Sequence, residues 1–192
     1  MLKELGIKSV RYADDIVLLA HSAEDASRAL EALSGWIEKA QLTLHPDKTR
    51  LVDMTQALAS FDFLGYRFLR SKKGKLIRLV RPKSKQKLRH SLKRPTKRAN
   101  GKSMEAIIAA INPKLEGWFA YFQQACLGEH QEMDRWVRMR LRSILRKRHK
   151  GRGRGRGLDH FKWPNRYFEN LGLFSLAQAR EELVSLHRGA NC

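Results

Sequence analysis

Hydrophobic positions along the first part of the chain follow first a strand-like and then a helical spacing. Residues 8–20 place β-branched and aliphatic side chains on both sides of Asp14 and Asp15, which is typical of a β-hairpin with the two carboxylates at its turn. In residues 22–40 apolar side chains recur every three or four positions, and Ser22 at the start predicts a capped helix. Further strands are expected at residues 42–44, 49–52, 61–68 and 75–80.

The rest of the chain has the spacing of helices. Residues 84–94 predict a short basic helix, and residues 104–111 predict another. At Asn112 and Pro113 a new helix is expected to begin, because Asn is a good cap and Pro suits the first helical position. With a long helix at residues 133–150 and a last one after Ser175, the pattern predicts an α+β fold.

The distribution of charge divides the chain. Its 192 residues carry a net charge of +20, and residues 71–157 hold 26 Lys and Arg against 5 Asp and Glu. Residues 1–70 are nearly neutral, with 9 basic and 10 acidic side chains. We therefore expect a boundary near residue 70 and a polyanionic partner, nucleic acid first, for the basic part. The alternating Gly and Arg of residues 151–157 predict a flexible linker before a terminal region at 158–192.

Cysteine usage and hydropathy narrow the class of protein. Cys126 and Cys192 are the two cysteines, and neither belongs to a Cys-x-x-Cys motif, which argues against a disulfide framework or a structural zinc site. Apolar runs are shorter than the roughly 18 residues of a membrane span, and the start lacks the pattern of a signal peptide. We expect a protein of the cytoplasm of a bacterial cell, or of an organelle matrix, with no membrane partner.

Three short motifs in the near-neutral part resemble one family. They are Tyr-Ala-Asp-Asp at 12–15, a Leu-x-Leu-x-x-x-Lys-Thr pattern at 42–49 and Phe-Leu-Gly-Tyr at 63–66. In this order and at these separations they resemble the palm of the reverse transcriptases encoded by group II introns. Residues 112–122 and 133–141 resemble the maturase-specific region of the same proteins. The resemblance implies a polymerase palm, here truncated, followed by a basic, mainly helical thumb and maturase region at 71–150.

The resemblance assigns roles in the palm. It implies Mg²⁺ as cofactor, with Asp14 and Asp15 as the acidic metal-binding pair, and Lys48 as a cation near the triphosphate or a proton donor to the leaving group. It also implies that Tyr12 and Ala13 line the incoming nucleotide. The stretch that positions the primer end matches Phe63, Leu64, Gly65 and Tyr66. From the residues alone, the two carboxylates also fit an ordinary solvated turn.

The chain also departs from the family pattern. The family's palm carries another metal-binding aspartate on a strand well before the Tyr-Ala-Asp-Asp motif, and only eleven residues precede Tyr12. We therefore expect that this chain alone does not polymerise, and that it is the carboxyl-terminal part of such a protein, as a truncated gene or a fragment. The alternative is a stand-alone or remnant RNA-binding protein with no catalytic role.

Candidate RNA-binding residues lie in the basic part. Arg138, Arg142 and Arg146 recur at four-residue steps in the helix at 133–150 and predict a phosphate-tracking ridge opposite its apolar face. The other expected contacts to phosphate are Lys83, Lys87 and Lys93, and Tyr121 is the candidate for stacking on a base. The expected partner is group II intron RNA. A DNA target or the missing amino-terminal part of the polymerase would be further partners.

Overall fold

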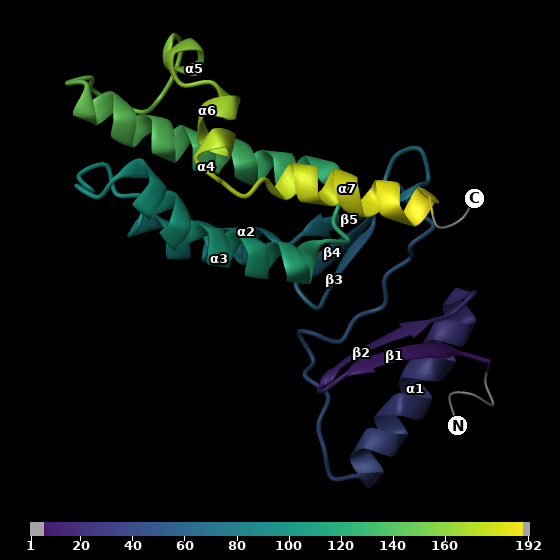
Figure 1. Ribbon diagram of the computed structural model, residues 1–192. Coiled ribbons are helices and arrows are strands. Elements are labelled where there is room, and N and C mark those ends of the chain that lie inside the picture. The colour runs from purple at the N-terminus through teal and green to yellow at the C-terminus, as the bar shows by residue number, and fades with distance from the viewer. Residues whose placement is uncertain (1–5, 190–192) are drawn as a thin grey trace. The chain divides into compact units, whose positions relative to one another are not determined.

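The computed structural model describes residues 6–189 of a chain that divides into two compact units, Met1–Ile77 and Arg78–Cys192. The first unit begins with an antiparallel hairpin of β1 (Lys8–Tyr12) and β2 (Asp15–Leu19) (Figure 1). Helix α1 (Ala23–Lys39) follows and packs against β2. The hairpin and the helix therefore lie where the hydrophobic pattern predicts them.

The start and the buried face of α1 follow from its sequence. The Ser22 hydroxyl accepts a hydrogen bond from the Asp25 backbone N–H at 3.0 Å, which satisfies one of the unpaired donors at the helix start. Three side chains at helical spacing, Ala29, Leu33 and Ile37, are buried. The predicted cap and the amphipathic face are both confirmed.

Residues 41–59 contain no strand, so the strands predicted at 42–44 and 49–52 are wrong. The chain instead turns at residues 46–48, and both the backbone N–H and the hydroxyl of Thr49 donate to the His45 carbonyl at 3.0 Å. A side chain that bonds to nearby backbone favours a local turn over a sheet ladder. These apolar runs are also too short and too exposed to form a buried strand.

The second sheet has the order β3-β4-β5, with β3 (Ser60–Phe63), β4 (Tyr66–Arg70) and β5 (Leu76–Val80). The prediction of one strand at 61–68 is wrong, because the chain reverses at Leu64 and Gly65. Both residues have positive φ, 47° and 78°, as a two-residue hairpin turn of the I′ class requires. The predicted turn before β5 is confirmed by the bond from the Gly74 N–H to the Ser71 carbonyl at 2.9 Å.

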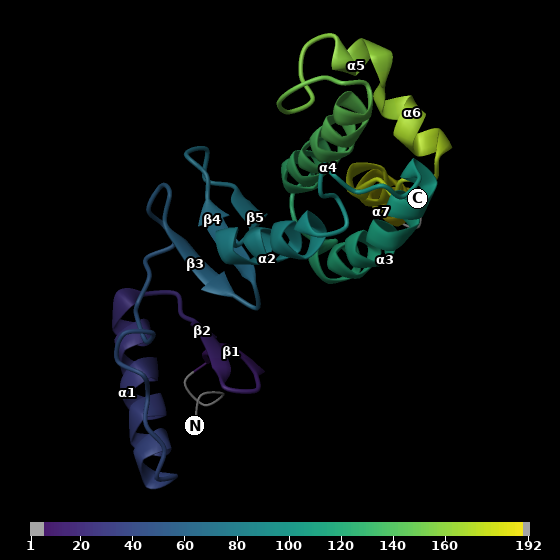
Figure 2. The same cartoon turned by 90° about the vertical axis from the view of Figure 1, so that its left-hand side faces the viewer.

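The second unit is helical. Its long helices are α2 (Pro82–Lys93), α3 (Met104–Phe122), α4 (Leu127–Arg148) and α7 (Leu176–Gly189), joined by the short α5 (Asp159–Lys162) and α6 (Asn165–Asn170). Figure 2 shows α7 flanked by α3 and α4, and it contacts both of them. The core joins apolar side chains of all these helices except α5, including Leu92, Ile111, Leu141, Phe168 and Leu176.

Helix α3 runs through the position where two helices were expected. Pro113 lies inside it, and the amide of Asn112 does not act as a cap. Instead Asn112 Nδ2 donates to the Gly172 carbonyl at 2.7 Å, and its Oδ1 accepts the Phe174 N–H at 3.0 Å. These contacts fix the chain that leads into α7, so the signal read as a helix start is a tertiary anchor.

The start of α7 is fixed by a buried carboxylate of α4. Asp134 accepts hydrogen bonds from the backbone N–H groups of Leu176 and Ala177, at 3.1 and 3.0 Å, and from the Ser175 hydroxyl. An acidic group at a helix N-terminus satisfies free donors and opposes the positive end of the helix dipole. The predicted helix after Ser175 is confirmed, and hydrogen bonds to Asp134 hold its first residues against α4.

Candidate nucleic-acid interface

The acidic pair of the palm stands on the β1–β2 hairpin. The register pairs Tyr12 with Asp15, so the two turn residues are Ala13 and Asp14. Asp15 is the first residue of β2, which corrects the expectation that both carboxylates occupy the turn. Both are exposed, and the Arg11 side chain braces the turn by donating to the Ala13 carbonyl at 2.9 Å.

The other palm candidates lie on two further turns. Lys48 is exposed in the turn after His45, with its N–H bonded to the His45 carbonyl at 3.1 Å. Leu64 and Gly65 form the β3–β4 turn, and Phe63 and Tyr66 face each other across it as the first pair of the hairpin. The expected palm residues thus stand on three separate turns of the first unit.

The acidic pair suits Mg²⁺ by donor type, since carboxylate oxygens are hard ligands. However, nowhere in residues 6–189 do three or more His, Cys, Asp or Glu side chains gather so that they could hold a metal ion. Two exposed carboxylates, one in the turn and one at the start of β2, do not by themselves form a closed two-metal site.

Helix α2 carries exposed lysines together with two cations that pair with α4. Lys85 lies 2.9 Å from a Glu132 carboxylate oxygen, and Arg89 lies 2.6 Å from the other. Lys85 also pairs with Glu129 at 3.2 Å. Burial opposes the charge of Lys85, but the bonds to these carboxylates outweigh it and raise its pKa.

The lysines of α2 that do not pair with α4 are those expected to contact RNA phosphates. Lys83, Lys87 and Lys93 are all exposed on α2. Because the basic residues between them are paired with α4, the helix is held in place while these three remain available to a ligand. We call Lys83, Lys87 and Lys93 the α2 basic face.

Two arginines of α4 bring a basic loop next to the end of that helix. Arg140 donates to the Thr96 hydroxyl at 2.6 Å and to the Lys93 carbonyl at 3.1 Å, so it caps the end of α2. Further along, Arg148 donates to the carbonyls of Asn100 and Lys102. The loop that these bonds hold carries exposed cations that the helical patterns did not single out: Arg94, Lys97, Arg98 and Lys102. Lys147 and Lys150 are exposed at the end of α4.

Protein groups hold much of the predicted ridge on α4, which reduces the charge that its three arginines offer to phosphate. Arg142 is 2% exposed, and its guanidinium donates to the Trp163 carbonyl and to Asn165 Oδ1, both at 2.8 Å. The side chain of Arg138 is 14% exposed and lies 3.9 Å from Asp134. Arg142 therefore has a structural place, and Arg138 offers little of its charge to a ligand.

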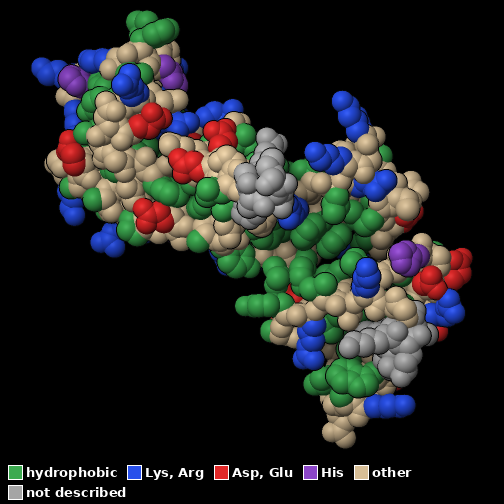
Figure 3. Space-filling view, turned by 45° about the vertical axis from the view of Figure 1, so that its right-hand side comes forward, with side chains coloured by type: hydrophobic (Ala, Val, Ile, Leu, Met, Phe, Trp, Pro, Cys, Tyr) green, Lys and Arg blue, Asp and Glu red, His purple; other side chains and the backbone are tan. Residues whose placement is uncertain are grey.

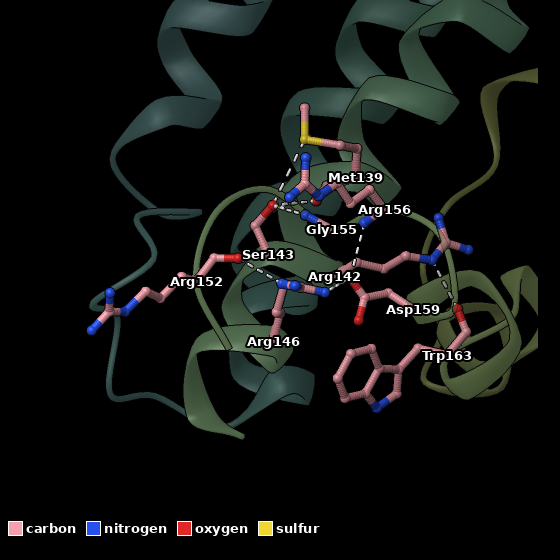
Figure 4. Close-up of polar contacts among 9 residues, drawn as sticks. All are labelled: Met139, Arg142, Ser143, Arg146, Arg152, Gly155, Arg156, Asp159 and Trp163. Atoms are coloured by element: carbon pink, nitrogen blue, oxygen red, sulfur yellow. Dashed lines mark hydrogen bonds and ion pairs between the residues drawn. The ribbon is translucent and has the colours of Figure 1, made fainter. Parts of the chain in front are cut away.

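Arg146 is also held by protein groups. Its Nε donates to the Arg152 carbonyl at 2.7 Å, and its Nη1 pairs with Asp159 at 2.8 Å (Figure 4). Burial acts to raise the pKa of Asp159, but the Arg156 N–H and the Arg146 guanidinium outweigh it and keep that pKa below its ordinary value. The third ridge position is thus one centre of an internal network.

The Gly/Arg stretch at 151–157 packs on α4, whereas the sequence predicted a flexible linker. The Gly155 N–H donates to the Ser143 hydroxyl at 2.9 Å in a buried position (Figure 4). A Cβ at Gly155 would lie 2.5 Å from Arg142 Cβ and 3.2 Å from backbone atoms, so only glycine fits. We call residues 151–157 the strap, because they lie against α4 between its end and α5.

Tyr121, the expected stacking residue, is 55% exposed near the end of α3. Its ring meets Phe122 edge to face, with the centroids 4.7 Å apart. That contact fixes one edge of the phenol, and the exposure leaves ring surface toward solvent.

None of the helices in the described part of the chain is long and apolar enough to cross a membrane.

Comparison with known protein families agrees with this division of the chain. Residues 1–68 match the reverse transcriptase (RNA-dependent DNA polymerase) family, and residues 85–163 match the group II intron maturase-specific domain. A search of curated proteins gives no match. The first match covers the hairpin and the Phe-Leu-Gly-Tyr turn, and the second covers most of α2, all of α3 and α4, and the strap. The chain therefore belongs to the reverse transcriptase/maturase proteins of group II introns, with a reverse transcriptase region at residues 1–68 and the maturase-specific domain at residues 85–163.

Proposed function

We propose that the chain binds structured group II intron RNA through its second unit, and in this way assists splicing and mobility of the intron. The observation that carries the proposal is that some basic residues of α2 form ion pairs with α4, while others on the same helix stay exposed. Lys85 and Arg89 pair with Glu132, while Lys83, Lys87 and Lys93 stay exposed on the same helix. Cations that a protein leaves unpaired in such number are typical of a phosphate-binding surface.

The neighbouring loop strengthens this proposal. Arg140 and Arg148 use their guanidinium groups to hold the backbone of residues 93–102, so the cations of that loop are presented in one arrangement. A preformed basic surface loses less conformational freedom on binding than a disordered tail does. Tyr121 would add a stacking contact to an unpaired base.

The test is the salt dependence of RNA binding. Neutralising roughly six phosphates should give a slope of log K against log salt of about −4 to −5, at 0.7 to 0.9 per contact. Replacing Lys83 and Lys87 by Ala should make this slope shallower by about 1.5 and weaken cognate and unrelated RNAs alike. Fluorescence anisotropy with a labelled intron RNA, at several salt concentrations, measures both effects.

The matched control removes the same charge from the first unit. Lys8 and Lys39 are exposed there, and the double change to Ala should leave the salt slope nearly unchanged. Binding that is insensitive to salt, or two double variants with equal effects, would show that the α2 basic face is not the RNA surface.

The reverse transcriptase region suggests a further role for the acidic pair only within a complete metal centre. Asp14 and Asp15 supply two carboxylates suited to Mg²⁺, and Lys48 supplies a cation. Because the described residues provide no third metal-binding side chain beside them, we assign this chain an RNA-binding function in the first place. A DNA target and a polymerase segment that completes the palm remain the further partners of this proposal.

A further inference from the structure

The chain after the strap exposes two large apolar side chains. Leu158 is 81% exposed and Phe161 is 84% exposed, more than any other large apolar side chain in the described part of the chain. Both belong to the single helical turn at α5, where the Phe161 N–H donates to the Leu158 carbonyl at 3.1 Å. We call Leu158 and Phe161 the strap tip.

The strap tip is held out by buried neighbours. Asp159 and Trp163, two positions before and after Phe161, are 7% and 6% exposed. Asp159 is bound by Arg146 and by the Arg156 N–H, and the Trp163 carbonyl is bound by Arg142 (Figure 4). Because the residues on both sides of Phe161 are anchored to α4, its phenyl ring stays on the surface. Its exposure is a property of the folded loop.

The surroundings of the tip are cationic. Arg152, Arg154, Arg156 and Lys162 are exposed, and the one acidic residue in 151–162, Asp159, is buried and paired. At the end of the second unit that carries α5, Figure 3 shows a projecting apolar group with Lys, Arg and His side chains near it. An exposed aromatic ring in a segment rich in unopposed arginines is an arrangement with which proteins bind single-stranded nucleic acid, because the ring can stack on a base while the cations contact phosphates.

We propose that the strap tip binds an unpaired stretch of RNA, with Phe161 stacking on a base and the strap arginines contacting the adjacent phosphates. This inference deepens the proposed RNA-binding function and rests on it. Two side chains offer far less area than a stable protein interface buries, whereas one aromatic ring is sufficient for one base. The charge around the ring is also complementary to a polyanion. The packing of the strap on α4 gives the contact a fixed position.

The experiment uses the full chain and two RNA probes with equal numbers of phosphates. One is a hairpin whose adenosine loop carries 2-aminopurine, and the other is a blunt duplex. Phe161→Ala should weaken binding of the hairpin between about fivefold and a hundredfold, leave duplex binding unchanged and leave the salt slope unchanged. The wild-type chain should also quench 2-aminopurine fluorescence, and Phe161→Ala should not. Phe161→Trp should restore both effects.

A matched control truncates another exposed apolar side chain of the same unit. Leu186 on α7 is 71% exposed, and Leu186→Ala should bind both probes like the wild type. If Phe161→Ala binds the hairpin like the wild type while the Lys83 and Lys87 variant is weakened, the stacking contact is refuted and the proposed function stands. If the wild type binds neither probe in a salt-dependent way, both fail. A wild-type dimer that Phe161→Ala converts to a monomer would identify the tip as a self-association surface and overturn the inference.

Discussion

Arg142 carries its charge into the interior of the second unit and has partners there. Its guanidinium binds the Trp163 carbonyl and Asn165, and lies 5.3 Å from the centre of the Phe168 ring. Burial, and then the charge of Arg138, lowers its pKa. A four-residue spacing on a helix is the same for a solvated ridge and for a buried polar seam. Whether such residues form a solvated ridge or a buried seam depends on the segment at 151–165, which covers this face of α4. The spacing of residues within α4 does not reveal that segment.

Replacement of Arg142 by Ala should therefore reduce stability and leave the number of phosphate contacts in RNA binding unchanged. The change leaves a buried carbonyl and the Asn165 amide without their donor, so we expect a loss of about 3 kcal/mol in the free energy of unfolding. The salt slope of RNA binding should not change. Lys147→Ala, an exposed position on the same helix, is the control and should do the reverse. Urea titration and anisotropy measure the two quantities, and a stable Arg142→Ala variant with a shallower slope would contradict the structural role.

The turn at Leu64 and Gly65 shows a second limit of local patterns. Gly65 was expected to belong to the stretch that positions the primer end, and its φ of 78° shows that the hairpin turn itself favours glycine there. Leu64 also has positive φ, which is uncommon for a residue with a branched side chain. The usual sequence signal for this turn is Asn-Gly or Asp-Gly. Because Leu replaces the polar residue, the alternating pattern around it resembled one continuous strand.

Among the elements, those with a strong local signal were predicted best. The buried stripes of α1 and α4 and the Ser22 cap were all visible in the spacing of apolar residues and in one hydroxyl. Besides the strands at 42–52 and 61–68, two errors in the second unit, at Pro113 and in the strap, share one cause. In both cases a residue type that usually interrupts structure is accommodated by contacts with a distant part of the chain, such as Asn112 with Gly172 and Gly155 with Ser143.

The packing of α3 on α4 includes a buried titratable group. His130 is fully buried, and its ring lies 5.8 Å from that of Trp118 and 5.5 Å from that of Phe119. Burial, together with the positive charge of Arg180, lowers its pKa to about 4. The folded state therefore keeps His130 neutral at a pH where the unfolded chain already binds a proton.

This difference makes the second unit sensitive to mild acid. Above about pH 6.5 both states hold His130 neutral, so the stability is complete there. As the pH falls toward 4, the unfolded state gains the proton first, and we expect a loss of about 1.4 kcal/mol per pH unit, or about 3 kcal/mol in all. His130→Phe should remove this slope. Urea unfolding at several pH values tests it, and equal slopes for the variant and the wild type would show that other groups cause the loss.

At the scale of the whole molecule, the polymerase motifs and the excess charge belong to different units. The acidic pair lies in Met1–Ile77, whereas α2, α4 and the strap lie in Arg78–Cys192. The counts of basic and acidic residues predicted a boundary near residue 70, and the contacts within the fold divide the chain after Ile77. The geometry of either site could not be predicted in this way, since it depends on which cations are paired across helices.

We expect that the chain alone extends no primer on an RNA template with Mg²⁺. Asp14 and Asp15 stand on an exposed hairpin, and no third metal-binding side chain joins them in the described residues. Polymerisation through two metal ions requires a more complete set of ligands than this pair. Primer extension with the purified chain is the measurement. DNA product that is lost in Asp14→Ala would show that the palm is sufficient as it stands.

The contacts that close the second unit also set the order in which it matures during translation. Asp134 accepts hydrogen bonds from the N–H groups of Leu176 and Ala177, and Asn112 bonds to Gly172 and Phe174. The ribosome adds these four partner residues well after Asn112 and Asp134. Chains grow at roughly 5–20 residues per second, so α3 and α4 spend seconds on the ribosome with these polar groups unsatisfied. A nascent chain stopped before residue 172 would lack the groups that bind Asn112 and Asp134. Completion of the RNA-binding unit is thereby tied to synthesis of its last helix.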